Sequence, residues 1–235
     1  QLLKPIFKAD VFSNVSNKFK FSKIQNQYIC NQFEGQIDTG NMMQELIRKV
    51  QTLGVIILNN TKVEAYIEHL NKVSIQTPHF EFSSQKLIFT TNGFAKQLIN
   101  ENVQPARAQV LITKPIENLD IKGTFHLDCG YYYFRNIDNR ILLGGGRHLD
   151  IKTETTTKLA QTEKIQQSLE NLLKYTILPE RDYEIDHRWS GIMGVGSQKK
   201  PIVKQLSNHV YCGVRMGGMG VAIGSLIGKE VSDFF

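Results

Sequence analysis

The first clear periodicity lies between residues 39 and 53, where apolar positions recur at helical spacing and end at a glycine. The apolar positions are Met43, Leu46, Ile47 and Val50. Asp38 or Thr39 can cap the start, and Gly54 can end the helix. A continuous apolar run, residues 55–58, follows directly and is typical of a strand buried on both faces. The pattern predicts an αβ unit.

Three short segments then alternate apolar and polar positions, over residues 63–67, 73–75 and 80–82, which predicts a small antiparallel meander. Residues 86–89 form a further predicted strand. This strand stops at a Thr-Thr-Asn-Gly turn, and a short helix is expected from Phe94 to Ile99. Such a turn places backbone donors and hydroxyls at the carboxyl edge of a sheet, where ligands bind in open α/β folds.

The middle of the chain is rich in predicted strands, which indicates a second sheet. The strand segments are residues 109–113, 124–127, 131–135 and 140–144. A long amphipathic helix, residues 157–176, is expected to pack over this sheet. Residues 1–35 carry several phenylalanines but predict no definite element. The fold class is therefore α/β (α+β).

The C-terminal pattern is two short strands, a glycine-dense turn and an amphipathic helix. The first N–H groups of a helix have no partner and favour an electron-rich ligand. The turn is not the dinucleotide-binding fingerprint, because Ile223 stands where its third glycine would be. Gly217, Gly218 and Gly220 favour ligand approach, whereas Gly224 and Gly228 fit ligand approach and tight helix packing equally well.

Composition and charge narrow the classes of protein. Of the 235 residues, 41% are hydrophobic and 21% charged, as in a globular domain. The net charge of +6 is spread along the chain with no recognition motif, which argues against a nucleic-acid partner. Three widely spaced cysteines argue against a disulfide framework and a zinc site, so we expect a cytoplasmic protein without a metal. No apolar run is long enough to span a membrane.

Several side chains fit both a structural role and a site. Tyr131 and Tyr133 share one face of a predicted strand, and either could lie in the core or in a site. The segment 186–194 holds the only tryptophan. Its Ser190-Gly191 pair is not a nucleophile elbow, because Trp189 replaces the first glycine of that motif. A structural role is favoured for His187.

Several segments together resemble one family. They are residues 34–38 with the following helix, 54–63, 87–93, 105–110, 131–135 with Gly144 and Gly145, 188–191, and the C-terminal tail. In order and spacing they resemble the FAD-dependent amino-acid oxidoreductases, the group of D-amino-acid oxidase, glycine oxidase and sarcosine oxidase. That family begins with a strand–Gly-x-Gly-x-x-Gly–helix unit which this sequence lacks. The resemblance thus implies the C-terminal part of a longer protein.

The resemblance also implies a division into domains and a set of FAD contacts. Residues 35–104 and 202–235 would be the remainder of an FAD-binding domain, and residues 1–34 and 105–201 an antiparallel-sheet substrate domain. No cysteine stands at the position of covalent flavin attachment, so FAD would be noncovalent. The implied cofactor-binding residues are Val63, Thr91, Asn92, Gly93, Gly191, Gly217, Gly218, Met219, Gly220 and Val221.

On the substrate side, the resemblance implies oxidation of an amine or of an amino or hydroxy acid by hydride transfer to flavin. Arg215 matches a family arginine near the substrate and is the candidate anion clamp, with Arg188 a weaker substitute. Met193 stands where glycine oxidase-like members carry a carboxylate-binding arginine. Tyr131 or Tyr133 would form a wall of the site. A homo-oligomer fits this picture. The alternative hypothesis is a non-catalytic fragment or binding module that holds no cofactor.

Overall fold

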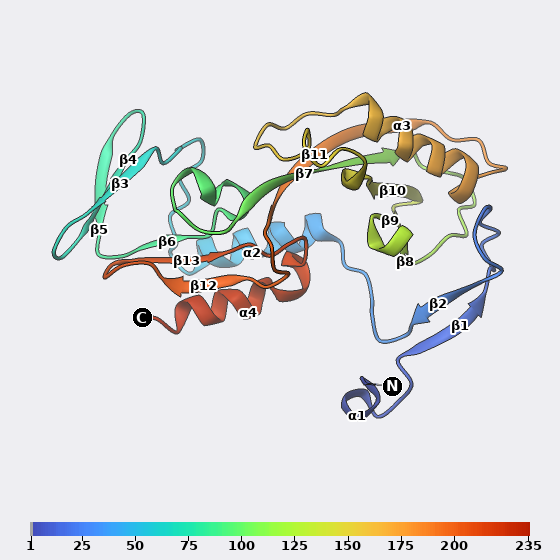
Figure 1. The fold of residues 1–235 in the computed structure, drawn as a ribbon, viewed down its shortest axis with the longest axis horizontal. Helices are drawn as coiled ribbons and strands as arrows, with labels where there is room; N and C mark the ends of the chain where they lie inside the picture. Colours follow the sequence, from blue (N-terminus) through green and yellow to red (C-terminus); the bar gives the residue numbers. More distant parts are fainter. Residues whose placement is uncertain (1) are drawn as a thin grey trace. The chain divides into compact units, whose positions relative to one another are not determined.

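The computed structural model describes residues 2–235, which form two compact units (Figure 1). Unit 1 comprises residues 1–38, 108–151 and 160–190, and unit 2 comprises residues 39–107, 152–159 and 191–235. Two long strands, β7 (Gln104–Thr113) and β11 (Ile185–Val195), contribute residues to both. Helices combine with largely antiparallel sheets, which confirms the predicted fold class. The predicted division into functional domains stays a prediction.

Unit 1 is built on a five-stranded sheet of order β11-β7-β10-β9-β8. Its other strands are β8 (Thr124–Leu127), β9 (Tyr132–Ile137) and β10 (Arg140–Gly145). The β9–β10 hairpin turns at Asp138 and Asn139, which both have positive φ, and its register pairs Gly144 with Tyr133. Short 3₁₀ turns follow β8 (Asp128–Gly130) and β10 (Arg147–Asp150). The second sheet is confirmed.

One face of this sheet is covered by α3 (Glu163–Leu172), which continues into a π turn (Leu173–Ile177). Ile165, Leu169 and Leu173 are fully buried in the same core as Leu111, Phe134 and Leu143 of the sheet. The helix was predicted from residue 157 but begins at Glu163. The Gln109 side chain binds both the N–H and the hydroxyl of Thr162, which keeps that residue extended until the helix starts.

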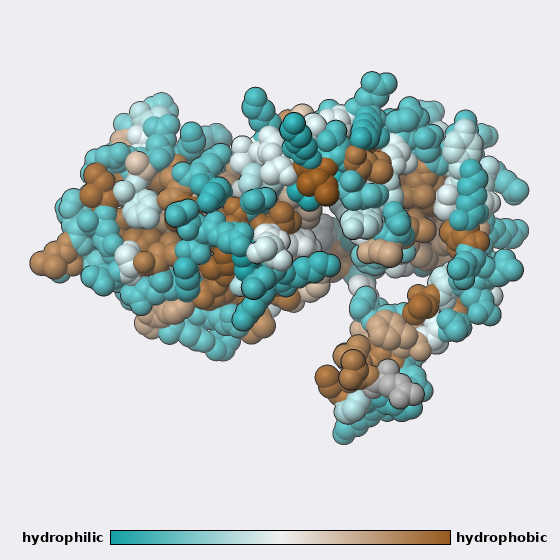
Figure 2. All heavy atoms as spheres, viewed as in Figure 1, coloured by the Kyte–Doolittle hydropathy of each residue, from teal (hydrophilic) through white to brown (hydrophobic). Residues whose placement is uncertain are grey.

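The N-terminal part of unit 1 carries a short helix, α1 (Lys4–Phe7), and an antiparallel hairpin of β1 (Phe12–Ser16) and β2 (Gln27–Asn31). In the connection from β1 to β2, Phe21 is buried and packs edge-on against Phe125 and Phe134 of the main sheet. Hydrophobic side chains gather on the surface around α1, where Leu2 is 94% exposed (Figure 2).

Unit 2 contains a sheet of order β12-β13-β6, made of β12 (Ile202–Gln205), β13 (Val210–Val214) and β6 (Leu87–Phe89). β13 and β6 are parallel. The 3₁₀ helix η1 (Asn92–Gln97) follows β6, and α4 (Gly220–Ser232) follows β13. The predicted antiparallel meander is confirmed. Its three strands are β3 (Ala65–Glu68), β4 (Val73–Gln76) and β5 (Glu81–Ser84).

The predicted helix before the meander is confirmed as α2 (Thr39–Thr52), and Gly54 follows it with a positive φ of 84°. The predicted buried strand at residues 55–58 is wrong. These residues are irregular and exposed, with Ile56 at 84%. The α2 apolar face is exposed as well, with Leu46 at 50%. A strand needs a partner, and none of the described strands pairs with these residues.

Candidate functional site

Three segments of unit 2 that are far apart in sequence meet at one corner: the turn after β6, the end of β11, and the turn after β13. The Asn92 side-chain oxygen accepts a hydrogen bond of 3.2 Å from the Met216 N–H. The Gly217 N–H donates to the Gly194 carbonyl at 2.9 Å. The structure therefore brings together the Asn92 turn and the tail turn, both of which the sequence singled out.

Glycines allow this close approach. A Cβ on Gly194 would lie 2.5 Å from the Asn92 side-chain oxygen, and a Cβ on Gly93 would lie 2.5 Å from the Met193 carbonyl. Gly217 and Gly218 adopt positive φ of 58° and 86°, the left-handed region that glycine enters without strain. Gly194 is a residue that sequence reasoning did not assign. A glycine inside a strand often marks close backbone approach, and that signal could have identified it.

Beside this corner lies a groove of about 420 Å³ between α4 and the β6–β13 pair, with Thr90, Met216 and Gly224 in its lining. It reaches the carboxyl ends of two parallel strands, where α/β folds bind ligands. A Cβ on Gly224 or Gly228 would meet no atom within 4 Å. These two glycines therefore face open space, and α4 instead contacts β13 at Gly213 through Ile227 and Val231.

The first turn of α4 has donors but no side-chain cap. The N-cap residue is Met219, whose carbonyl accepts the N–H groups of Ala222 and Ile223. Met219 and Val221 are each 56% exposed. A Cβ on Gly220 would lie 3.6 Å from the Met216 sulfur, an ordinary van der Waals contact. This helix start can bind a group rich in negative charge.

The remaining predicted cofactor-binding residues are spread over unit 2. Thr91 is the N-cap of η1, and its carbonyl accepts the Phe94 N–H. Gly191 has open space around its Cβ position. Val63 is half-buried against the core of unit 2, before β3. Of these three, Thr91 lies in the turn that forms the corner.

Arg215 lies at the corner with its side chain buried. Its Nε donates to the Lys200 carbonyl at 2.8 Å, and its Nη1 donates to the Asn102 carbonyl at 2.9 Å. The residue is 7% exposed and has a positive φ of 64°. The guanidinium thus holds the main chain at two points, and a substrate anion would have to bind through Nη2. Its use as an anion clamp stays a prediction.

In unit 1, Tyr133 lies on the sheet face that α3 does not cover, and Tyr131 directly precedes β9. Tyr132 and Phe134 belong to the α3-side core, so Tyr133 points to the other face by alternation. A Cβ on Gly144 would lie 2.6 Å from the Tyr133 hydroxyl, so this ring lies flat over the glycine. Burial raises the pKa of Tyr133. Tyr131 is 53% exposed, with its ring centroid 4.2 Å from that of His148.

Arg188 points to the opposite face of the sheet from Tyr133. Its guanidinium forms an ion pair of 2.8 Å with Glu170 and a hydrogen bond of 2.7 Å to Gln166, both on α3. By alternation, its neighbour Trp189 lies on the open face and is 40% exposed. Trp189 therefore joins Tyr133 on this open face, whereas Arg188 does not.

Comparisons with known proteins define the class. The family model described as FAD dependent oxidoreductase matches residues 22–234, so the chain belongs to that family. The probable oxidoreductase OrdL of Haemophilus influenzae is 22% identical over 215 residues, 85% of this chain and 47% of its own length. Gamma-glutamylputrescine oxidoreductase of Escherichia coli is 21% identical over 71% of this chain and 40% of its own length.

Solved structures share the fold. Glycine oxidase from Geobacillus kaustophilus gives a TM-score of 0.82 at 13% identity, covering 98% of this chain and 64% of that one. L-proline dehydrogenase from P. horikoshii gives 0.77 at 16% identity, covering 97% and 65%. The chain thus spans about half the length of the curated relatives it matches.

Two further features concern ions and membranes. Within residues 2–235, no group of three or more His, Cys, Asp or Glu side chains could hold a metal ion. No helix in the same range is long and apolar enough to cross a membrane.

Proposed function

We propose that this chain provides the flavin-ring corner and the substrate-side sheet of an FAD-dependent oxidoreductase that acts on an amine or on an amino or hydroxy acid. The observation that carries the proposal is the meeting of the Asn92 turn, the end of β11 and the tail turn beside an open groove. Membership of the family supplies the cofactor class. FAD would be noncovalent, and the cytoplasm would be the compartment.

The residues at the corner fit a flat, electron-rich group. The tail turn is free of side chains at Gly217 and Gly218, and a Cβ on Gly217 would meet nothing within 4 Å. The uncapped start of α4 offers backbone N–H donors and the positive end of a helix dipole. When bound, flavin supplies the acceptor for a hydride from the C–H next to the amine or hydroxyl. The α4 donors would stabilise negative charge at the ring edge.

On the substrate side, this chain's residues orient rather than transfer protons. The Tyr133 ring is fixed over Gly144, and Tyr131 and Trp189 are partly exposed aromatic side chains. Burial raises the pKa of Tyr133, so its hydroxyl stays neutral at physiological pH. These aromatic groups would pack against the carbon skeleton of a ligand bound on the open face of unit 1. Within unit 2, Arg215 would have its Nη2 left for an anion.

A second candidate is that the 235 residues alone bind no cofactor. Exposed apolar residues in unit 2 favour it: residues 55–58 and the apolar face of α2 lack a covering layer. In addition, β6 ends the sheet order β12-β13-β6, so one of its edges has no partner among the described strands. An additional layer of protein would then be needed before FAD binds.

The test compares the visible absorption spectrum of the longest natural form of the protein with that of the 235-residue chain, each after incubation with FAD. Flavin bands in the longer form, bleached anaerobically by an amine, an amino acid or a hydroxy acid, support the enzyme. A longer form that stays colourless after reconstitution overturns it. Flavin bands in the short chain would reject the second candidate.

A matched pair of variants tests the groove itself. Gly224→Leu fills the groove, whereas Ser225→Leu adds the same side chain one position away, outside its lining. We expect Gly224→Leu to lower FAD affinity at least tenfold while far-ultraviolet circular dichroism stays unchanged. Equal FAD affinity in the two variants would show that the groove plays no part in cofactor binding.

A further inference from the structure

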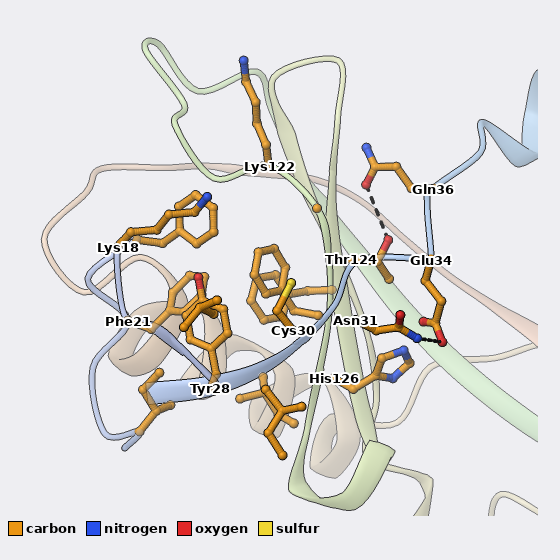
Figure 3. A pocket seen from close by; sticks show the side chains of 18 of the residues that line it. Lys18, Phe21, Tyr28, Cys30, Asn31, Glu34, Gln36, Lys122, Thr124 and His126 are labelled. Atoms are coloured by element: carbon orange, nitrogen blue, oxygen red, sulfur yellow. Dashed lines mark hydrogen bonds between the residues drawn. The ribbon is translucent and has the colours of Figure 1, made fainter. Parts of the chain in front are cut away.

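Two cavities of the structure differ in charge. The larger, about 1080 Å³, lies within unit 1 between the β1–β2 hairpin and β8, and its lining includes Lys18, Glu34 and Lys122 (Figure 3). The groove beside the corner of unit 2 measures about 420 Å³, within the range of about 300–1,000 Å³ that is usual for small-molecule sites. None of the described residues that line this groove is charged, and Thr90 supplies their only hydroxyl.

The corner itself carries a single charged side chain. Its three segments, with their neighbours in sequence, are residues 90–95, 190–198 and 213–228, and Arg215 is the only Asp, Glu, Lys, Arg or His among them. A molecule bound at the corner would therefore meet one cation from these segments, and neither a carboxylate nor an imidazole.

Methionines gather at the corner instead. Three of the five in the chain, Met193, Met216 and Met219, lie in its segments. The Met193 sulfur lies against the tail turn, 3.3 Å from the position of a Cβ on Gly218, and Met216 belongs to the lining of the groove. Met219 is 56% exposed at the start of α4. Thioethers are apolar and polarizable, adapt to ligands of different shape and pack against aromatic rings. They suit an apolar ligand.

Arg215 cannot hold a carboxylate at two points in the usual way. Arginine binds a carboxylate bidentately through two neighbouring nitrogens, Nε with Nη2 or Nη1 with Nη2. In each pair one nitrogen already binds the main chain, because Nε donates to the Lys200 carbonyl and Nη1 to the Asn102 carbonyl. The side chain also lies against Gly196, where a Cβ would be 2.6 Å from the Arg215 Cδ. Nη2 alone leaves a one-point contact.

We propose that the substrate is a hydrophobic amine without a carboxylate on its reacting carbon, and that Met193 and Met216 select it. The inference rests on the proposed function, because the reacting C–H must come within about 3–3.5 Å of a flavin ring held at the corner. In an amino acid or a hydroxy acid the carboxylate is attached to that same carbon. It would lose its water in these uncharged surroundings without a bidentate partner, which is costly.

The lack of a base in the corner segments favours an amine over an alcohol. When an amine is oxidised, the C–H bond breaks and its hydrogen leaves with both electrons as a hydride to the flavin. The lone pair of the neutral nitrogen forms the C=N bond of an iminium, so no proton has to be removed in this step. Oxidation of an alcohol requires a base for the hydroxyl proton, and the three segments contain no His, Asp or Glu.

Matched substrate pairs test the proposal on the intact, flavin-loaded protein. N-methylbenzylamine is compared with N-methylphenylglycine, and N-methylbutylamine with N-methylnorvaline, so that each pair differs by one carboxylate. We expect kcat/KM from anaerobic bleaching of the flavin to be at least tenfold higher for the amine of a pair. Met193→Arg should shift this ratio at least tenfold toward the acid. Met43→Arg, on the exposed face of α2, adds the same charge elsewhere and should leave the ratio unchanged.

A binding measurement gives an answer without turnover. Aniline has no C–H next to its nitrogen and cannot be oxidised in this way, and benzoate has the same ring with a carboxylate. In protein labelled with ¹³C at the methionine methyl groups, assigned by Met→Leu substitution, aniline should shift the Met193 and Met216 signals and leave Met43 unchanged. Its affinity should exceed that of benzoate at least tenfold. Tighter binding of benzoate, or no shift at Met193 and Met216, overturns the proposal.

The outcomes separate this proposal from the proposed function. Flavin bands that bleach equally fast or faster with the amino acid of each pair leave the oxidoreductase intact and overturn the selection against a carboxylate. An intact protein without flavin bands after reconstitution fails at the proposed function, and this inference falls with it. The wild-type ratio of rates decides the question even if Met193→Arg does not fold.

Discussion

The side chain of Asn92 holds the backbone of Met216, through a hydrogen bond of 3.2 Å that joins two turns 124 positions apart. Asn92 itself has a positive φ of 44°. Asparagine enters this region more readily than most residues, because its short amide can bond locally. One residue type therefore satisfies both the backbone conformation and the link between the turns.

Variants of Asn92 separate these two contributions. Asn92→Gly removes the hydrogen bond but tolerates the conformation, so it should cost about 0.5–1.5 kcal/mol of stability. Asn92→Ala also places a Cβ in the left-handed region and should cost about 1–2 kcal/mol more. Asn92→Asp keeps the acceptor and should remain near the wild type. Urea unfolding measures all three, and equal stability of the Gly and Ala variants would contradict the role of φ.

The contact between Tyr133 and Gly144 predicts a coupled pair. Gly144→Ala places a methyl group 2.6 Å from the tyrosine hydroxyl and should destabilise the protein by about 1–3 kcal/mol. In a Tyr133→Ala background the same substitution should cost much less, because the ring is gone. Thermal unfolding of the four proteins in this double-mutant cycle provides the measurement. An identical cost in both backgrounds would show that the ring does not lie over the glycine.

A buried ion pair fixes the segment 152–159 to β7. Arg107 donates through Nε and Nη2 to the two carboxylate oxygens of Glu154, each at 2.8 Å, with exposures of 5% and 0%. Arg107→Met leaves a buried carboxylate without its cation and should cost about 3–5 kcal/mol. The double variant Arg107→Met/Glu154→Leu should recover much of that loss.

The matched control for this prediction is an exposed ion pair. Lys114 and Glu184 lie 2.5 Å apart with side chains 55% and 73% exposed. Glu184→Gln should leave the unfolding midpoint in urea within experimental error, because solvent screens such a pair. A large effect there, or a small effect of Arg107→Met, would reverse the expected ranking of the two pairs.

Glu68 predicts a dependence of stability on pH. A hydrogen bond from Ser207 lowers the pKa of this carboxyl below its ordinary value of 4.5, and the His209 N–H adds to the effect. The native state thus favours the ionised form. Its contribution is complete above pH 4.5 and is lost as the pH falls through the lower native pKa. Glu68→Gln should flatten the acid limb of melting temperature against pH, with Glu64→Gln as the control.

The local elements could be read from the sequence because their signals are local. The alternation around Val73 and Ile75 predicts β4, and the glycine at position 54 marks the end of α2. The strand prediction for residues 55–58 was wrong because a strand forms only beside a partner strand, and the residues of this run do not specify whether a partner is present. The start of α3 was missed because Gln109, more than fifty positions away, holds Thr162 extended.

In the candidate site, too, local segments could be identified from the sequence, whereas contacts between distant segments could not. The glycine-dense tail and the Thr91–Gly93 turn were identified from residue types, and their meeting is a property of the fold. Sequence could not show that Arg215 binds the Lys200 and Asn102 carbonyls, because those partners lie in separate segments. It also could not decide which face of β11 carries Arg188, since that depends on the position of α3.

The exposed run at residues 55–58 has a consequence for how the chain behaves in a cell. Val-Ile-Ile-Leu combines high β-propensity with no charge and no proline, the composition from which aggregates nucleate. If no other part of the protein covers this stretch after synthesis, it becomes a target for chaperones and proteases. Replacing Ile56, which is 84% exposed, by a charged residue should therefore change the soluble yield of the 235-residue chain when it is expressed by itself.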